Sequence, residues 1–164
     1  MDTNTRPELE ADRNGIRNVH LASVPTADEA DLVDQLRDND SLVFSLVAIV
    51  AGQVVGHVAF SRMESPERTL GLGPVRVSPA FRRQGIAAGL IREGMQIARV
   101  DGWNAVFVLG DPAYYGRFAF SVEDARAFES PYAGPHFMVP MLYDKDRLGQ
   151  TRTVTYASAF AALG

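Results

Sequence analysis

The chain contains no cysteine, which excludes disulfides, thiolate zinc sites and cysteine nucleophiles. A long apolar run is also missing: the longest, from Leu42 to Ala51, is interrupted by Ser45 and is too short to span a bilayer. The polar stretch from Met1 to Asn18 lacks the apolar core of a signal peptide. These absences predict a cytoplasmic protein with no membrane partner.

An excess of positive charge is lacking as well. The chain has 16 Lys and Arg against 20 Asp and Glu, a net charge of -4, so a nucleic-acid partner is not expected. The histidines His20, His57 and His136 are far apart in the sequence and lack the spacing of metal ligands. No metal site is expected.

The length of 164 residues and an apolar fraction of 46% fit one compact domain. We expect residues 1–14 to form a polar, weakly attached N-terminal segment and residues 15–164 to form a single domain.

Hydrophobic patterning predicts a mixed α/β sheet. Helices are expected over 27–37 and 85–100, and a short aromatic helix or turn over 112–118. The tail from Arg147 to Gly164 has no clear pattern. Short β-branched or alternating runs predict strands over 16–21, 42–51, 54–63, 70–77, 105–109 and 137–142. The second and third of these read as a hairpin, the segment from 70 to 109 as a right-handed βαβ unit, and Gly73-Pro74 as a bulge.

One loop carries a chemical signal. A strand ends at Val77, and Arg82, Arg83 and Gly85 follow just before a predicted helix. The first amides of a helix have no intrahelical acceptors, and a glycine lets a phosphate approach the backbone closely. The loop therefore predicts an anion cradle suited to a pyrophosphate. The alternative is a glycine at a helix start beside solvated arginines, because such a loop is weak evidence alone.

The surrounding motifs strengthen that prediction. Arg82-x-x-Gly85-x-Ala87, following Val77-Ser78-Pro79, resembles the signature of the GCN5-related N-acetyltransferase (GNAT) superfamily. The segments 56–61 and 109–120 are similar to its third strand and to the region after its fifth strand in one bacterial subgroup. The resemblance implies a single-domain mixed sheet of about six or seven strands. This sheet is splayed between its fourth and fifth strands and flanked by helices.

The resemblance also implies site residues. The strand residues Val75, Arg76 and Val77 would hold the pantetheine arm of acetyl-CoA. Tyr115 would protonate the departing thiolate, although Tyr114 and Tyr115 as packing residues are the alternative. The residues around the pyrophosphate would be Arg82, Arg83, Gln84, Gly85, Ile86 and Ala87.

The sequence departs from the family at three points. The helix after the fifth strand is shortened and has no counterpart of the asparagine that often touches the cofactor in the family. Ala119 stands where a glycine is usual, and the strand over 70–77 has no carboxylate to act as general base. The remaining candidates are Glu64, Glu67, Asp111, His57 and a water chain, and none of them stands out.

The implied activity is transfer of an acetyl group from acetyl-CoA to a primary amine, on a small molecule or a peptide, by direct attack on the thioester. A catalytically weak acyl-CoA sensor or partner-binding module is the alternative, and a longer acyl group is a third possibility. The 131–135 loop either lines the acceptor site or only turns the chain. A monomer and a homodimer are both compatible with the sequence.

Overall fold

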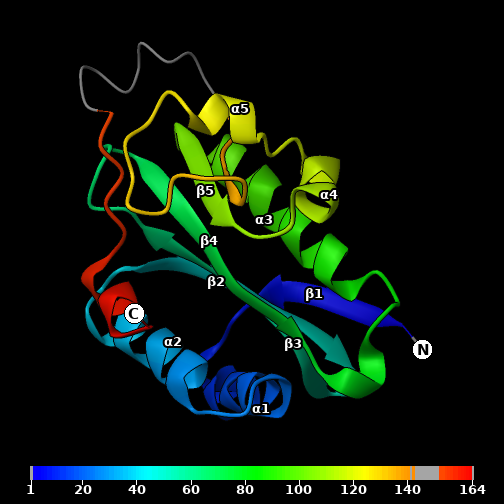
Figure 1. The fold of residues 1–164 in the computed structure, drawn as a ribbon. Coiled ribbons are helices and arrows are strands. Elements are labelled where there is room, and N and C mark those ends of the chain that lie inside the picture. Colours follow the sequence, from blue (N-terminus) through cyan, green and yellow to red (C-terminus); the bar gives the residue numbers. More distant parts are fainter. Residues whose placement is uncertain (1, 141, 143–151, 164) are drawn as a thin grey trace.

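A six-stranded mixed sheet forms the centre of the computed structural model, which describes residues 2–140, 142 and 152–163 (Figure 1). The strands lie side by side in chain order, and only the pair β4–β5 is parallel. The strands are β1 (Thr3–Pro7), β2 (Leu42–Val50), β3 (Gln53–Arg62), β4 (Thr69–Val77), β5 (Ala105–Leu109) and β6 (Phe137–Met138). This architecture confirms the predicted fold class.

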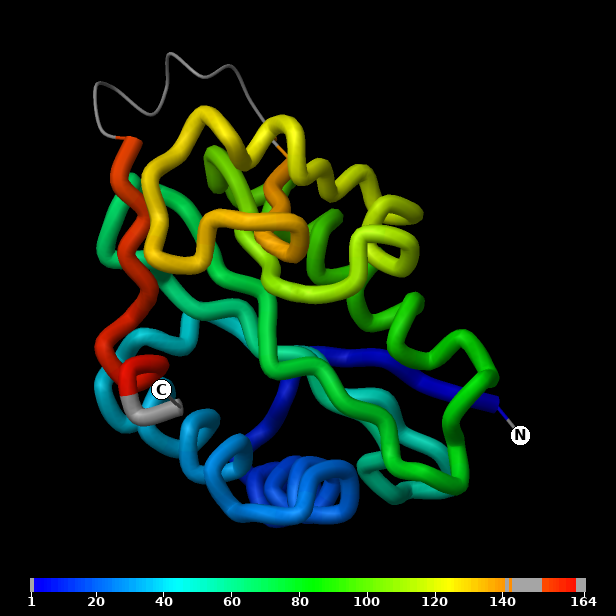
Figure 2. The backbone as a smooth tube through the Cα atoms, in the orientation of Figure 1, coloured from blue at the N-terminus to red at the C-terminus, as the bar shows by residue number. Residues whose placement is uncertain are grey.

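Helices cover both faces of this sheet (Figure 1). The helices α1 (Arg13–Ser23) and α2 (Asp28–Asp38) lie on one face, and α3 (Ile86–Val100) lies on the other. The chain also forms α4 (Pro112–Tyr115), α5 (Val122–Ala125) and the 3-10 turns η1 (Glu10–Asp12), η2 (Pro79–Phe81), η3 (Gly116–Phe118) and η5 (Ser158–Leu163). The C-terminal segment returns to α2, so that η5 packs beside it (Figure 2).

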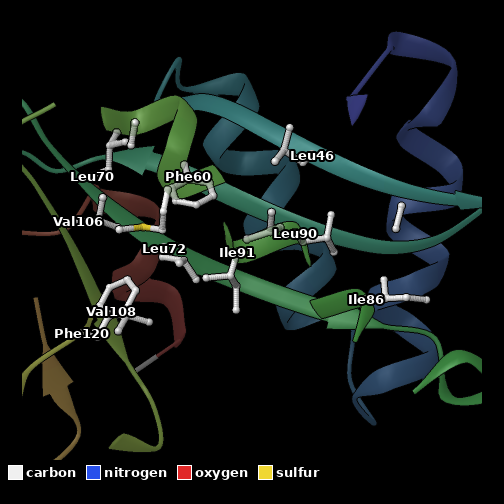
Figure 3. Packing of buried hydrophobic residues seen from close by; sticks show 14 of the residues in the cluster. Leu46, Phe60, Leu70, Leu72, Ile86, Leu90, Ile91, Val106, Val108 and Phe120 are labelled. Carbon is white, nitrogen blue, oxygen red and sulfur yellow. The ribbon is translucent and has the colours of Figure 1, made fainter. Parts of the chain in front are cut away.

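The helix α3 packs closely on the sheet. Leu90 and Ile91 are fully buried and belong to the same cluster as Phe60 of β3 (Figure 3). A Cβ atom on Gly94 would overlap the Phe60 ring, so the glycine allows the close approach that its position in a helix predicts. Gly89 has no such neighbour within 4 Å. Burial of each large side chain contributes roughly 1.5–3 kcal/mol to stability.

The N-terminal segment is part of the sheet, which makes the predicted weak attachment wrong. Strand β1 pairs with β2 from Thr3↔Val50 to Pro7↔Leu46. The Arg6 guanidinium also binds the Asp12 carboxylate at 2.6 Å. Strand β1 lies at an edge and is largely exposed, so its sequence lacks the apolar alternation that marks a strand.

The predicted strand over 16–21 is also wrong, because these residues lie in α1. Ile16, Val19 and His20 are its buried residues, which is a helical spacing. The other predicted elements are confirmed within a few residues, except the last strand, which shortens to Phe137–Met138. Residue 141 and residues 147–151 and 164 of the predicted strand and tail lie outside the described residues.

The sheet opens between β4 and β5. The strands pair at Thr69↔Ala105, Leu70↔Val106 and Gly71↔Phe107, and in the described strands the pairing stops there. Opposite Ala59, β4 carries two residues, Gly73 and Pro74, between the paired positions 72 and 75. This is the predicted bulge, and it leaves the rest of β4 free of β5.

Candidate active site

The predicted anion cradle lies where β4 leads into α3. The η2 turn follows β4, and the Arg82 Nε donates to the Val77 carbonyl at 3.3 Å. Arg83 and Gly85 both have positive φ, +64° and +79°. Gly85 caps α3, and a Cβ atom there would meet nothing within 4 Å. The left-handed backbone therefore turns the loop sharply and leaves open space at the helix N-terminus.

A cavity of about 380 Å³ adjoins this helix end. Three of its lining residues, Arg82, Arg83 and Arg117, carry positive charge, and the N-terminus of α3 adds the partial charge of its amides. The rest of the lining is Val77, Phe81, Gly85, Ile86, Ala87, Ala88 and Tyr114. Gln84 is exposed in the loop and does not line the cavity. The arrangement suits a multiply charged anion.

The sequence analysis did not include Arg117. Its guanidinium lies 5.2 Å from the centre of the Tyr114 ring, which holds it beside the cavity. An arginine close to the predicted site residue Tyr115 in the sequence was the available indication. Only the fold shows that Arg117 lines the same cavity as the start of α3.

A second cavity, of about 270 Å³, lies at the opening of the sheet. Its walls come from both splayed strands, from α2, and from two late segments of the chain. It is mostly apolar and aromatic, and among the described residues Glu29 is the one charged member of its lining. The lining consists of Glu29, Leu32, Leu72, Gly73, Pro74, Leu109, Tyr132, Tyr156 and Phe160. Tyr132 belongs to the 131–135 loop, for which a lining role was one of the two predictions.

The Glu29 carboxylate is held from two sides. The Arg76 Nε donates to it at 2.9 Å, and the Nδ1 of His20 lies 2.8 Å away. Burial pushes the pKa of Glu29 upward, but the hydrogen bonds from His20 and Arg76 outweigh it and lower the pKa below its ordinary value. Glu29 is therefore ionised at neutral pH. Arg76, predicted to hold the cofactor, is thus paired with a carboxylate across the sheet opening.

The two histidines His20 and His57 meet in the interior. Both are fully buried, and the His20 Nε2 lies 2.8 Å from the His57 Nδ1. Burial, and then the nearby positive charges of His20 and Arg37, lower the pKa of His57 well below its ordinary value. His20 and His57 are therefore in contact although they are far apart in the sequence, and the sequence alone did not predict this contact. In the part of the chain that the structure describes, no group of three or more acidic or histidine side chains is placed to hold a metal ion.

None of the four residues considered as general base lines either cavity. Glu64 and Glu67 are exposed in the loop before β4, and Asp111 caps α4 by accepting from the Ala113 amide at 3.0 Å. His57 is enclosed. The carboxylate at the opening is Glu29, which lies far from every motif in the sequence and reaches β4 only through the fold.

Tyr115 lies on α4, just after β5. Its ring contacts Gly110 and packs against Tyr114 and Phe120 at centroid distances of 5.1 and 5.7 Å. Burial, with a smaller effect of Tyr114, raises the pKa of Tyr115 to about 12, although the positive charge of Arg76 acts in the opposite direction. The hydroxyl is therefore protonated at neutral pH. Arg76 contacts Glu29, whereas Tyr115 lies on α4 and is not in the lining of either cavity.

A mixed sheet that opens beside an anion cradle, with a second cavity at the opening, defines an α/β protein that can hold a charged cofactor next to a second ligand. The chain belongs to the Acetyltransferase (GNAT) family, whose sequence model matches residues 10–120. No helix in the described part of the chain has the length and apolar character needed to cross a bilayer.

The chain is similar to two proteins of Escherichia coli K12. It is 35% identical to the uncharacterized N-acetyltransferase YhbS, over 94% of this chain and 96% of that protein. It is 34% identical to the uncharacterized N-acetyltransferase YjhQ, over 76% of this chain and 74% of that protein. The structure of E. coli YhbS in complex with CoA matches with a TM-score of 0.89 and 34% identity, covering 99% and 93% of the two chains. A GNAT acetyltransferase of Brucella melitensis in complex with acetyl-CoA matches with a TM-score of 0.82 and 33% identity, covering 97% and 98%.

Proposed function

We propose that the protein is an N-acetyltransferase that moves the acetyl group of acetyl-CoA to a primary amine on a small molecule or a peptide. The observation that carries this proposal is the opening between β4 and β5, with the anion cradle on one side and the Glu29 cavity on the other. Two similar proteins were solved with CoA or acetyl-CoA, which supports the same donor here.

The cradle would hold the pyrophosphate of the donor. The amides at the start of α3, from Gly85 to Ala87, and the side chains of Arg82 and Arg83 supply the donors and the positive charge. The open space at Gly85 allows the close approach that a phosphate needs. The backbone groups of Val75 and Val77, which β5 leaves unpaired, would hold the pantetheine arm.

The reaction follows from this placement. The amine nitrogen attacks the thioester carbonyl carbon, a backbone amide of β4 at Val75 polarises the carbonyl oxygen, and the C–S bond breaks. Tyr115 is the proton donor to the departing sulfur. Its raised pKa keeps the phenol protonated at neutral pH, although the same shift makes it a weaker acid than an ordinary tyrosine.

The second cavity would bind the acceptor. Its carboxylate suits an ammonium group, and its aromatic wall of Tyr132, Tyr156 and Phe160 suits an apolar or aromatic body. The Tyr156 hydroxyl is buried and has no hydrogen-bond partner among the described residues, so it is free to bind a polar group of the acceptor. We therefore expect an arylalkylamine to be a better acceptor than a polyamine.

The competing function is an acyl-CoA-binding module without turnover. A two-step experiment separates the two: calorimetry with acetyl-CoA, then a spectrophotometric assay of CoA release over a panel of arylalkylamines, polyamines and lysine peptides. Amine-dependent release supports the enzyme. Binding without release on the whole panel supports the module, and the same assay with propionyl-CoA and longer thioesters tests the acyl length.

Three further predictions accompany this function. We expect a cytoplasmic location, a single domain that includes strand β1 together with residues 15–164, and a monomer or homodimer. Fluorescence microscopy of a tagged chain, limited proteolysis and light scattering test them in that order.

A further inference from the structure

Acetylation of an amine needs a group that removes a proton from nitrogen. At neutral pH a primary amine is mostly an ammonium ion, which has no lone pair for attack. In this chain β4 has no carboxylate, so the group must come from another element.

Glu29 is placed to meet this need. It is the one acidic or basic side chain in the lining of the cavity at the sheet opening, and its side chain is 16% exposed. The same cavity is lined by Gly73 and Pro74, the bulge that separates β4 from β5. Its partner Arg76 lies on β4, two residues after Pro74, and its side chain is 42% exposed, so the carboxylate is held beside the stretch of β4 that follows the bulge.

The contacts behind Glu29 fix the direction of its hydrogen bonds. An ionised carboxylate only accepts, so the His20 Nδ1 must carry the proton that it shares with Glu29. The other nitrogen of His20 meets the Nδ1 of His57 at 2.8 Å. Because both rings are fully buried, water does not compete for these bonds.

His57, at the other end of this chain of contacts, lies near a second carboxylate, that of Glu8. Oε1 of Glu8 lies 3.9 Å from the His57 Nε2, and the same carboxylate binds Arg37 at 2.9 Å and the Ser45 hydroxyl. The two histidines thus lie between two carboxylate–arginine pairs, Glu29–Arg76 and Glu8–Arg37. This arrangement compensates the buried charges and holds His20 in one orientation.

We propose that Glu29 is the general base of acetyl transfer, and that His20 and His57 are positioning residues that hold its carboxylate at the opening between β4 and β5. The proposal rests on the proposed function. The acceptor nitrogen loses two protons as its bond to the acetyl carbon forms and the C–S bond breaks. One proton goes to the Glu29 carboxylate and leaves through water in the cavity. The other goes to the Tyr115 phenolate, which has given its own proton to the sulfur, so the phenol is restored and one proton is released in all.

The first test removes the carboxylate. Glu29→Gln should lower kcat/KM for the best amine by about 10²–10⁴-fold near neutral pH, and the loss should shrink at higher pH, where more of the amine is already free. Glu29→Asp keeps the carboxylate but on a shorter side chain, so its kcat/KM should lie between those of the wild type and Glu29→Gln. Asp31→Asn is the matched control, because this carboxylate lies on the same helix, is exposed and binds only Arg17 in the ion pairs described. Acetyl-CoA affinity should be the same in all four proteins.

The second test addresses the positioning residues through the pH profile. The groups that face Glu29 are His20 of α1, Arg76 of β4, and Tyr132 and Tyr156 in the lining of the same cavity. Behind them lie His57 of β3, Arg37 of α2 and Glu8. Loss of the His20 donor in His20→Leu should raise the pKa of Glu29 and move the acid limb of kcat/KM toward neutral pH. His20→Gln keeps an N–H donor and should restore the wild-type limb.

The outcomes distinguish a failure of Glu29 as general base from a failure of the proposed acetyltransferase function. Turnover by the wild type with an unchanged rate and pH profile in Glu29→Gln would overturn Glu29 as the base and leave the proposed function standing. If the His20→Leu protein folds and the acid limb of its pH profile is the same as in the wild type, the positioning role is overturned. If His20→Leu does not fold, His20→Gln decides, and an acid limb shifted from the wild-type pH would overturn the positioning role. Binding of acetyl-CoA without turnover of any amine by the wild type would remove the proposed function and the base with it.

Discussion

Removal of one hydroxyl in Tyr115→Phe tests the proposed acid directly. The ring contacts with Tyr114, Phe120 and Gly110 do not involve the hydroxyl, so the free energy of unfolding should change by less than about 0.5 kcal/mol. Loss of a positioned proton donor lowers kcat by about 10²–10⁴-fold, or about 2.7–5.4 kcal/mol in the activation free energy. The affinity for acetyl-CoA should be preserved, because the lost interaction forms only as the thiolate leaves.

The pH profile adds a second readout. Burial raises the pKa of Tyr115 to about 12, so the phenol stays protonated over the usual assay range. Ionisation of this group should therefore produce no fall of kcat as the pH rises to about 10, the ordinary pKa of tyrosine. A basic limb near that value which disappears in Tyr115→Phe would show that the phenol is not shielded as the structure places it.

The neighbouring hydroxyl gives the comparison. Tyr114 lines the cradle cavity, and Arg117 lies against its ring. In Tyr114→Phe any effect should therefore appear in acetyl-CoA affinity and not in kcat. Assays of CoA release at saturating amine, with calorimetry for the donor, measure both quantities. Equal and small effects on kcat from the two variants would refute the acid role, and a large effect from Tyr114→Phe alone would move it by one residue.

Three other changes test the cradle, a strained turn and the buried histidine. Gly85→Asp should keep the fold, because a Cβ atom there has open space, although the positive φ of +79° should cost about 1 kcal/mol of stability. It should weaken acetyl-CoA binding more than tenfold, or about 1.4 kcal/mol, by calorimetry, and unchanged affinity would exclude this loop as the phosphate site. Ala119 has φ of +71°, so Ala119→Gly should raise the urea midpoint, with a gain of up to about 1 kcal/mol, and a lower midpoint would contradict the strain. Because the pKa of His57 is lowered in the folded state, the unfolded chain binds a proton at this residue more strongly. The free energy of unfolding should therefore fall as the pH drops below about 6.5, by at most about 1.4 kcal/mol per pH unit. His57→Asn should reduce this pH dependence in urea titrations at several pH values.

The sequence predicted the elements that local chemistry determines. The hairpin of β2 and β3, the βαβ unit and the bulge at Gly73 and Pro74 all follow from turn residues and periodicity, and the structure confirms them. The roles of the cradle residues and Tyr115 stay predictions.

The features that the sequence did not predict depend on contacts between distant residues. Strand β1 has no apolar pattern of its own and is a strand only because β2 offers it an edge. The pairing of Glu29 with Arg76 spans 47 positions, and His20 meets His57 across 37. Periodicity places His20 on a helix face or a strand face equally well, and only the packing of α1 on β3 decides that it is buried beside another imidazole.

The two cavities draw on different parts of the chain, and this has a consequence for how the protein can change. The cradle comes from one continuous stretch around the start of α3 with the nearby α4 region, whereas the proposed acceptor wall joins α2 to the 131–135 loop and to Tyr156 and Phe160 near the C-terminus. Substitutions in the wall can therefore accumulate without disturbing the donor site. A library restricted to positions 132, 156 and 160 should yield variants with altered amine selectivity and a common affinity for acetyl-CoA, so the acceptor range can evolve or be engineered independently of the chemistry.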